Sequence, residues 1–485
     1  MVVMENRARW VMHWDEVAVF DRNATSIGFE EMDLMRSAGE ALAEEAASMA
    51  GGGDVLFLCG PGNNGGDGFV ASCSDSLSGS SVSVISSHKS SKTACSSEAR
   101  EMARKSVDFH QWPSVPDRRW SLVVDCLLGA GASGPGDSLR PPISDIVEWA
   151  GKLGSPVLAC DIPTGLGGPD CLVAEKTVTF HSLKSGMGYP ECGEIIVSEL
   201  PWSDEVQDCG IGDACRYPAI VRNSRKGDRG RLLVVGGGPF HGAPILAGLA
   251  AARSGCDLVH VAMPAAAMAR SSWPQSLIPE HLPDVDYLTT NSVKVLSGLF
   301  DSGRAPDSVV IGPGLGRGEE TAKAVRNILE IVSSREIPVV IDADAIDCLP
   351  PGRWPELLTG VATPHGGEAD RWLGSSSPEE ALSGCKGENQ AIVVTGPKDI
   401  LTGPEGRRAS SSGGHPRMAV GGTGDILAGS IGGLMAQGMA PWPAARLGCA
   451  LLRDAGRRAA DEKGPGTLAE DVPVHIAHTL ADWTR

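Results

Sequence analysis

"GDRGRLLVVGGGPFHGAPILAGLAAARSGCDLVHVAMP" (residues 227–264) contains two apolar runs separated by a glycine-rich loop and a helix-length segment. Uninterrupted apolar strands are typical of parallel sheets that are buried on both faces. Glycine at the end of the first run allows a tight turn and a close approach of the backbone to a ligand. The stretch therefore predicts a strand–loop–helix–strand unit, and with it an α/β fold.

The same alternation extends through the whole chain of 485 residues, which is too long for one ordinary core. We expect six strands in the first half and five in the second, and therefore two α/β domains, the first a Rossmann-like three-layer domain. The polar stretch "CRYPAIVRNSRKGDRG" (215–230) is the natural boundary, which gives domains at 1–215 and 216–485. Two amphipathic helices are expected in 15–50, and a solvated helix, a strand and a loop in the Ser-rich segment 72–97.

Composition limits the classes of function. The net charge of −18 argues against broad binding of nucleic acid or anionic membranes, although a small anionic ligand is still compatible with it. The thirteen cysteines are scattered and form no C-x-x-C pair, so buried reduced thiols are expected. No signal peptide and no membrane span are predicted. We therefore expect a cytoplasmic protein with small-molecule ligands, no nucleic-acid partner and no membrane partner.

Three polar loops follow strands in the first half. "GPGNNGGDG" (60–68), "VVDCLLGAGASGPG" (123–136) and "CDIPTG" (160–165) each place glycines or carboxylates where an apolar run ends. Because parallel strands end at one sheet edge, Asn64, Asp125 and Asp161 are expected to converge there. A single glycine loop is equally explained as a plain turn, and Asp161 alone as a turn or capping residue; their combination favours a site.

Together with "TVTFHSLKSGM" (177–187), these motifs resemble the NAD(P)H-hydrate epimerase domain over most of residues 15–212. The resemblance implies binding of the hydrated nucleotide by the first two loops, a K⁺ ion, and Asp161 as a substrate contact and acid/base. The implied K⁺ ligands are Asn64, Asp125 and Thr164, oxygen donors of the kind that a hard cation prefers. The implied substrate-binding residues are Asn63, Asn64, Gly65, Gly66, Asp67, Gly129, Ala130, Gly131, Ala132, Ser133, Gly134, Pro135 and Asp161.

One motif departs from the epimerase pattern. That family usually carries Met-Glu-Asn-Ala-Gly in its second helix, whereas this chain has "MRSAG" (35–39), with Arg36 and Ser37 in place of a carboxylate and an amide. Epimerase competence is therefore open at this point. The alternative is a non-catalytic nucleotide- or RNA-binding module fused to an active second domain.

In the second half, "MAVGGTGDILAG" (418–429) places backbone N–H groups at the start of an apolar helix, where they suit a phosphoryl group. Asp425 follows directly, and a second anion cannot bind phosphate. We therefore expect Gly422–Gly424 to hold the transferring phosphoryl charge while Asp425 accepts a proton from the attacking hydroxyl. A capping role for Asp425 is compatible with this but insufficient, because Ser or Asn would cap equally well.

The loops "GAPILAG", "VVIGPGLGRG", "TPHGGE", "VVTGPKDIL" and "GGTGD" resemble the ADP- or ATP-dependent NAD(P)H-hydrate dehydratase, a ribokinase-like fold, over residues 220–485. The two domains in this order resemble the bifunctional NAD(P)H-hydrate repair family. The implied activities are epimerisation of R and S NADHX and NADPHX, and dehydration of the S form through phosphorylation of its C6 hydroxyl. The implied substrate contacts are Ala243, Gly316, His365 and Asp425, and the implied nucleotide contacts are Thr395, Gly396, Pro397, Lys398, Asp399 and Gly424.

Some assignments in the second half rest on general chemistry or stay open. Mg²⁺ is expected with the nucleotide, because phosphoryl transfer usually needs its charge. The family commonly has Lys-Gly where this chain has Thr395-Gly396, so the choice between ADP and ATP is open. Asp342 and Asp344 are interpreted at most as supporting or metal-linked residues. Another ribokinase-like small-molecule kinase is the remaining alternative, and a homo-oligomer is expected.

Overall fold

The computed structural model describes residues 11–131, 136, 138–383 and 389–485, and the chain divides into two compact units, Met1–Val206 and Gln207–Arg485. The boundary expected at 215/216 therefore lies inside the second unit. The reason is a buried ion pair: Asp213, in a short 3₁₀ turn (Ile211–Arg216), accepts at 2.6 Å from the guanidinium of Arg446, whose side chain is fully buried.

The first unit has a seven-stranded sheet in the order β4-β3-β2-β5-β6-β7-β9, in which every neighbouring pair is parallel. A two-stranded parallel sheet, β1-β8, accompanies it. The strands are β1 (Val11–Met12), β2 (Val55–Cys59), β3 (Val82–Ser86), β4 (Asp108–Gln111), β5 (Leu122–Cys126), β6 (Val157–Cys160), β7 (Lys176–Phe180), β8 (Leu183–Lys184) and β9 (Glu194–Ser198).

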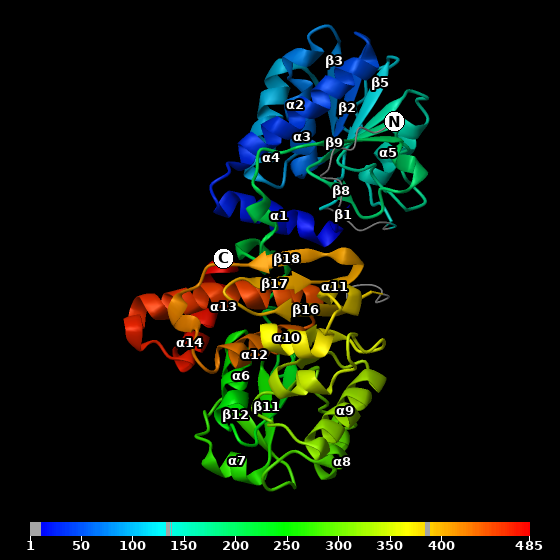
Figure 1. Cartoon of the computed structure of the whole chain (residues 1–485). Coiled ribbons are helices and arrows are strands. Elements are labelled where there is room, and N and C mark those ends of the chain that lie inside the picture. Colours follow the sequence, from blue (N-terminus) through cyan, green and yellow to red (C-terminus); the bar gives the residue numbers. More distant parts are fainter. Residues whose placement is uncertain (1–10, 132–135, 137, 384–388) are drawn as a thin grey trace. The chain divides into compact units, whose positions relative to one another are not determined.

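Helices cover both faces of this sheet, as Figure 1 shows. The buried cluster on one face joins α2, α3 and α4 to the strands, and α5 packs on the other face. The helices are α1 (Val17–Ser26), α2 (Glu31–Ala50), α3 (Asn63–Ser72), α4 (Ala94–Ser106) and α5 (Ile143–Gly151). The three-layer prediction is confirmed, as are the two helices in 15–50. The helix expected after residue 72 is only a 3₁₀ turn (Asp75–Leu77), because the serines there supply little apolar surface to bury.

The second unit has a nine-stranded sheet in the order β12-β11-β10-β13-β14-β15-β16-β17-β18, parallel up to β16 and antiparallel for the last two strands. The strands are β10 (Arg231–Val235), β11 (Leu258–Met263), β12 (Leu277–His281), β13 (Ser308–Ile311), β14 (Val339–Ile341), β15 (Gly360–Ala362), β16 (Gln390–Val394), β17 (Asp399–Thr402) and β18 (Arg408–Ser411). All eleven strands that we expected in the two halves are present. The strands that the sequence did not predict include short or polar ones such as β4, β15 and β18.

Two helical layers also cover the second sheet. One buried cluster joins α6, α7, α12, α13 and α14 to the strands, and the other joins α8, α9, α10 and α11, with α8 beside α9 in Figure 1. The helices are α6 (Gly242–Arg253), α7 (Ala265–Arg270), α8 (Thr290–Phe300), α9 (Glu319–Ser334), α10 (Gly366–Leu373), α11 (Pro378–Ala381), α12 (Thr423–Ala436), α13 (Pro441–Lys463) and α14 (Val472–Trp483). None of the helices in the described ranges is both long and apolar enough to cross a membrane. Many of the described cysteines are buried, as expected.

Candidate active sites

The first candidate site lies where β2, β5 and β6 end. Asp125 is the fourth residue of β5, Asp161 directly follows β6, and Asn64 lies in the first turn of α3 after β2. An added Cβ at Gly129 would lie 3.0 Å from the Asn64 amide oxygen and 3.1 Å from a carboxylate oxygen of Asp161. The structure therefore brings these side chains to one edge of the sheet, around a glycine loop that leaves room for them.

Asp125 and Thr164 form a compact set of buried oxygens. The Asp125 carboxylate accepts from the Thr164 backbone N–H and hydroxyl, each at 2.8 Å, and from the Leu127 N–H at 3.1 Å. Burial raises the pKa of Asp125 to about 6, although hydrogen bonds from Thr164 and Leu127 oppose the shift. A nearby cation would favour the ionised carboxylate, since an opposite charge offsets the cost of burial.

The Asn64 amide belongs to the same region and has a buried amide nitrogen without a hydrogen-bond partner in the described part of the chain. A 180° rotation of the amide exchanges its nitrogen and its oxygen. An amide, a carboxylate and a hydroxyl are all hard oxygen donors, so these residues fit a monovalent or hard divalent cation. No group of three or more His, Cys, Asp or Glu side chains in the described ranges has the arrangement of a metal site.

Asp161 adopts a positive φ of 67°, unusual for a residue with a side chain. Its carboxylate accepts from the Ala130 N–H at 2.8 Å and from the Thr179 hydroxyl at 3.3 Å, and it pairs with the Lys184 ammonium at 2.9 Å. Strained backbone of this kind persists only where the surroundings hold it, and it is enriched at active sites.

The glycine loop residues serve the packing of the chain as much as a ligand. An added Cβ would lie 2.0 Å from the Gly60 oxygen at Gly65 and 2.5 Å from the Met35 side chain at Gly66. Asn63 donates to Glu31 at 3.1 Å and accepts from Thr93 at 2.6 Å, so its amide orients the loop. The predicted contacts Ala132, Ser133, Gly134 and Pro135 lie outside the described residues.

The departure at "MRSAG" falls on the outer surface of α2. The Arg36 side chain is 60% exposed and pairs with Asp33 one turn earlier at 3.0 Å. It lines a surface groove with residues of α4 such as Glu98 and Met102. Arg36 therefore makes no ion pair with the Asp161 carboxylate, whose cationic partner is Lys184.

The second candidate site lies at the start of α12. Gly422 precedes the helix with φ 103°, and an added Cβ there would lie 2.5 Å from Leu246, so only glycine fits without strain. An added Cβ at Gly424 would meet no atom within 4 Å, so this side of the helix start is open. The first N–H groups of a helix lack partners within it, and they attract an anion.

Asp425 lies in the first turn of α12 and is half-buried. Burial raises its pKa to about 7, with a further contribution from the charge of Asp342. Asp342 is itself buried and accepts from the Thr363 hydroxyl at 2.8 Å. Burial and the nearby Glu368 and Asp344 charges raise the pKa of Asp342 to about 6, against the hydrogen bond from Thr363. A general base needs a pKa near the working pH, and Asp425 meets that condition.

The packing of α12 against α6 places Ala243 near Asp425. An added Cβ would lie 2.0 Å from the Ala247 oxygen at Gly429, and 2.8 Å from the Ala251 Cα at Gly433. The two helices therefore run side by side in the same direction with almost no space between their backbones. Gly429 therefore faces Ala247, and Gly433 faces Ala251. Four residues earlier in each helix, about one turn, the same register places Asp425 opposite Ala243.

The predicted nucleotide loop, Thr395–Asp399, is fixed by an arginine that sequence reasoning missed. Arg453, on α13, pairs with the buried Asp399 at 2.6 Å and donates to the Gly396 carbonyl at 2.7 Å. Asp399 in turn accepts from the Gly396 N–H at 3.1 Å. No spacing rule connects residues this far apart in sequence, so only the fold reveals the contact. The position where the family has lysine is Thr395, whose N–H donates to Pro364 at 2.8 Å.

His365 caps α10 and joins this loop. Its ring accepts from the Gly367 N–H at 3.0 Å, and its backbone N–H donates to the Glu368 carboxylate at 2.9 Å. The residue also forms a β-bridge with Thr395. The side chain is 60% exposed, so the ring is accessible to a ligand. The predicted substrate contact and the predicted nucleotide loop are thus neighbours.

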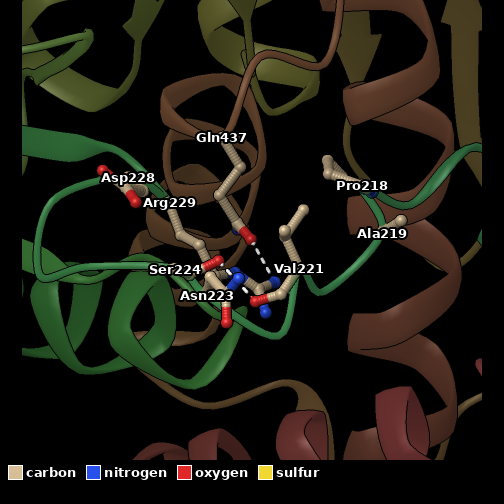
Figure 2. A pocket seen from close by; sticks show the side chains of 8 residues that line it. All are labelled: Pro218, Ala219, Val221, Asn223, Ser224, Asp228, Arg229 and Gln437. Atoms are coloured by element: carbon tan, nitrogen blue, oxygen red, sulfur yellow. Dashed lines mark hydrogen bonds between the residues drawn. The ribbon is translucent and has the colours of Figure 1, made fainter.

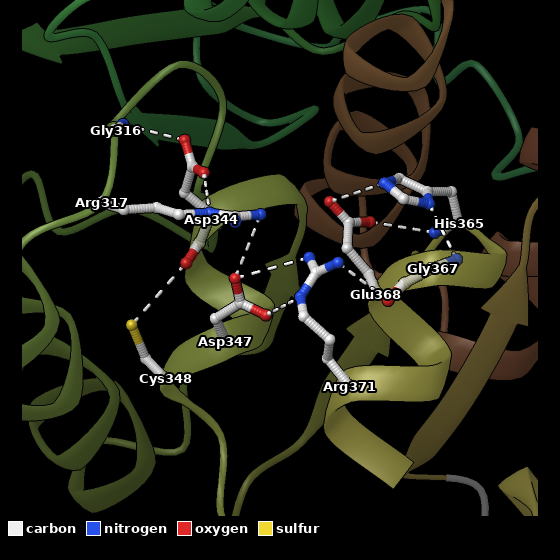
Figure 3. A network of polar contacts seen from close by, with 9 residues as sticks. All are labelled: Gly316, Arg317, Asp344, Asp347, Cys348, His365, Gly367, Glu368 and Arg371. Carbon is white, nitrogen blue, oxygen red and sulfur yellow. Dashed lines mark hydrogen bonds and ion pairs between the residues drawn. The ribbon is translucent and has the colours of Figure 1, made fainter. Parts of the chain in front are cut away.

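Gly316, with φ 77°, is tied to the same region by a polar network drawn in Figure 3. Asp344 accepts from the Gly316 N–H at 2.8 Å. Arg317 lies 3.4 Å from Asp344 and 3.3 Å from Asp347. Asp347 also pairs with Arg371 of α10 at 3.0 Å, so the Gly316 loop and α10 are linked through shared charges.

A separate pocket, shown in Figure 2, lies away from these loops. Its lining includes Gln437, which ends α12 and accepts from Arg229 at 2.7 Å. Since α12 spans Thr423–Ala436, this pocket is about 20 Å along the helix from Asp425. It lies at the amino ends of the strands and does not belong to the predicted site.

Comparison with known proteins gives a family match for each of the two units. The family model described as NAD(P)H-hydrate dehydratase matches residues 232–477, and that of the YjeF-related protein N-terminus matches residues 31–186. The bifunctional NAD(P)H-hydrate repair enzyme Nnr of Hyperthermus butylicus is 35% identical over 96% of this chain and 91% of its own length. The enzymes of the same name from Methanothermobacter thermautotrophicus and Coxiella burnetii are 32% and 31% identical, over 96% and 95% of this chain and 94% and 97% of their own lengths.

A solved structure of the ADP/ATP-dependent NAD(P)H-hydrate dehydratase from Bacillus subtilis, co-crystallised with ATP and Mg²⁺, is 24% identical. It covers 56% of this chain and 96% of its own length, with a TM-score of 0.47. The relatives span both units of this chain at more than 30% identity. The chain belongs to the family of bifunctional NAD(P)H-hydrate repair enzymes, with an epimerase domain followed by an ADP/ATP-dependent dehydratase domain.

Proposed function

We propose that Asp425 is the general base of the dehydratase. The observation that carries the proposal is a half-buried carboxyl of raised pKa in the first turn of α12, next to a turn that only glycine can adopt. The C6 hydroxyl of S-NADHX or S-NADPHX loses its proton to Asp425 while its oxygen attacks the terminal phosphorus of ADP or ATP. Phosphate then leaves with the C6–O bond pair, a proton is lost from C5, and the C5–C6 double bond that forms restores the dihydronicotinamide ring.

Substrate and nucleotide would approach Asp425 from two sides. Ala243, Gly316 and His365 are proposed to contact the hydrated nucleotide, and Thr395, Gly396, Pro397, Lys398, Asp399 and Gly424 the adenine nucleotide. The α6–α12 register and the bridge between His365 and Thr395 support this arrangement. When bound with the nucleotide, Mg²⁺ would supply positive charge to the transferring phosphoryl group.

For the first domain, we propose that Asp161 is the acid/base of epimerisation. C6 of the hydrated ring carries both a hydroxyl and the ring nitrogen, so removal of the hydroxyl proton lets the C6–N1 bond break and an aldehyde form. Reclosure on the opposite face of the aldehyde gives the other epimer. Asn64, Asp125 and Thr164 would hold K⁺, which would supply charge beside the bound nucleotide.

A dehydratase with a non-catalytic first domain is the second candidate. The observation behind it is the replacement of two family residues by Arg36 and Ser37. The exposure of Arg36 and its pairing with Asp33 weaken that alternative, because Arg36 does not replace Lys184 as the cationic partner of Asp161. A cytoplasmic location and a homo-oligomeric state stay predictions from the sequence.

Mixed R and S NADHX incubated with the protein and ADP or ATP separates the two candidates. Complete recovery of NADH absorbance, faster than enzyme-free epimerisation permits, means that both domains are active. Recovery that slows to the spontaneous rate once the S form is consumed means that the first domain is non-catalytic. Running ADP and ATP separately identifies the preferred phosphoryl donor.

A further inference from the structure

Lys184 is a buried cation that no assignment above uses. Its side chain is 3% exposed, and its ammonium contacts Asp161 at 2.9 Å, the Thr179 hydroxyl at 3.0 Å and the Phe180 carbonyl at 2.6 Å. An ammonium has three N–H donors, and these three acceptors account for all of them. Lys184 is therefore saturated, so it orients and balances charge and has no free donor for a substrate.

The charge of Lys184 determines what Asp161 can do. A buried carboxylate is costly unless an opposite charge or hydrogen bonds accompany it, and Lys184 provides the charge. The lysine is fixed in place by β8, which pairs with β1 through Met12 and Lys184. The ammonium of Lys184 thus lies against the Asp161 carboxyl, whose backbone is in a strained conformation.

A second carboxyl faces this site from α1. Val17, at the start of α1, packs against the cluster that contains Ala130, Ile162 and Leu183, the neighbours of the Asp161 site. Asp21 lies one helical turn after Val17, on the same face of α1, and is partly buried. The sequence placed helices in this region but assigned none of their residues to the site.

The charges around Asp21 come from four elements. Burial raises the pKa of Asp21 to about 7; the Asp161 and Glu31 charges add to the shift, and the Lys184 charge opposes it. Asp67 of α3 also faces the site, and burial with the Asp161 and Asp21 charges raises its pKa well above the ordinary value. Both shifts favour the protonated carboxyl, and the pKa of Asp21, at about 7, lets it both give and retake a proton near neutral pH.

We propose that Lys184 is a positioning residue that holds Asp161 as the base, and that Asp21 is the acid that protonates the ring nitrogen when the C6–N1 bond breaks. The proposal rests on the proposed role of Asp161 in epimerisation. In the forward step, the C6 hydroxyl proton moves to Asp161, the O–H electron pair forms the C6 carbonyl, and the C6–N1 pair moves to N1, which takes the proton of Asp21. Reclosure on the other face reverses every transfer, so no atom or electron is gained or lost.

The pH profile of R-to-S epimerisation, measured with the full chain, tests both roles. In the native protein, we expect kcat/KM to fall above about pH 7 as Asp21 loses its proton. Asp21→Asn should lower kcat about 100-fold and abolish that fall, since a general acid contributes on this scale. On the acid side of the profile, kcat/KM should rise with pH, and Lys184→Met should move this rise to higher pH. Lys184→Arg, which keeps the charge, should restore much of the native profile.

The controls separate a failure of the fold from a failure of the proposal. Asp33→Asn on α2 and Lys152→Met directly after α5 change exposed residues and should leave the profile unchanged. ADP- or ATP-dependent dehydration of S-NADHX reports on the other domain, and a thermal melt reports on folding of every variant. A native descending limb in a folded Asp21→Asn protein overturns the role of Asp21. A native profile in folded Lys184→Met overturns the role of Lys184. Absence of epimerisation in the native protein instead refutes the proposed function of Asp161.

Discussion

The two proposed catalytic carboxylates stand in opposite surroundings. Asp161 has its balancing charge built into the fold, since the Lys184 ammonium lies 2.9 Å away and two further donors contact its oxygens. Asp425 makes no ion pair and no side-chain hydrogen bond with the described residues, and its charged neighbour is another carboxylate, Asp342. The difference lies in where the positive charge comes from.

The chemistry of each domain explains that difference. Epimerisation transfers protons and no charged group, and a residue of the protein, Lys184, balances the charge of the proposed base. In phosphoryl transfer the bound ligands bring charged groups into the site. A base of raised pKa therefore needs no cationic partner from the protein before the ligands bind. Glycine provides the positive φ beside Asp425, whereas Asp161 adopts a positive φ itself, held by its three contacts.

The largest effect is expected from Asp425→Asn. Without a base, ADP- or ATP-dependent dehydration of S-NADHX should fall by about 1,000-fold, because general-base catalysis contributes on this scale. Binding of the adenine nucleotide, measured by calorimetry, should persist, since the Thr395–Asp399 loop is fixed by Arg453. Substantial turnover in this variant would exclude Asp425 as the base. Epimerisation of R-NADHX is the internal control.

Asp161→Asn is expected to have the second largest effect, of about 100-fold, on epimerisation. The asparagine keeps the shape but leaves the Lys184 ammonium without its balancing charge, so a thermal melt must accompany the assay. Dehydration of S-NADHX should be unchanged. Equal losses in both assays would show that the two domains do not act separately.

Much of this comparison could be predicted from the sequence. Apolar runs ending in Asp125, Asp161 or a glycine loop placed both sites at sheet edges, because parallel strands end together. The helix start at Gly422 and the position of Asp425 followed from local patterns alone. Local periodicity and motif spacing thus predicted the fold class, the glycine loops and the helix start whose backbone N–H groups can bind a ligand.

The partners of the carboxylates could not be predicted. Lys184 follows β7 closely in the chain and reaches Asp161 because β7 pairs with β6, the strand that Asp161 follows. Arg453 reaches Asp399 from a distant helix. The ion pair between Arg446 and Asp213 is of the same kind, and it explains why the second unit begins before the boundary that the sequence predicted. Such ion pairs depend on tertiary packing, and no periodicity or residue spacing in a single sequence predicts that packing. The tight approach of α6 to α12 at Gly429 was hidden for the same reason.

The pH dependence of dehydration sharpens the comparison at a smaller scale. Because Asp425 must be ionised to accept a proton and its pKa is raised to about 7, kcat/KM should fall about tenfold for each pH unit below 7. Asp342→Asn removes the like charge that raises the pKa of Asp425, so the midpoint should move to lower pH by a fraction of a unit. The profile is measured with S-NADHX at subsaturating concentration. A midpoint unchanged or raised in Asp342→Asn would contradict the assigned coupling.

The smallest effect is expected from Asp347→Asn, which cuts the link between Arg317 and Arg371 in Figure 3. Both arginines are partly exposed, so each pair contributes little, and the KM for S-NADHX should rise about two- to fivefold. The KM for ADP or ATP and kcat should stay close to native, because Asp347 connects the Gly316 loop to α10 and has no contact with the Arg453-fixed loop. Asp370→Asn, an exposed change on α10, is the matched control. Since the network is held by opposite charges, added salt should raise the native KM toward that of the variant and affect the variant less. An equal response to salt in both proteins would mean that Asp347 does not hold the substrate loop through charge.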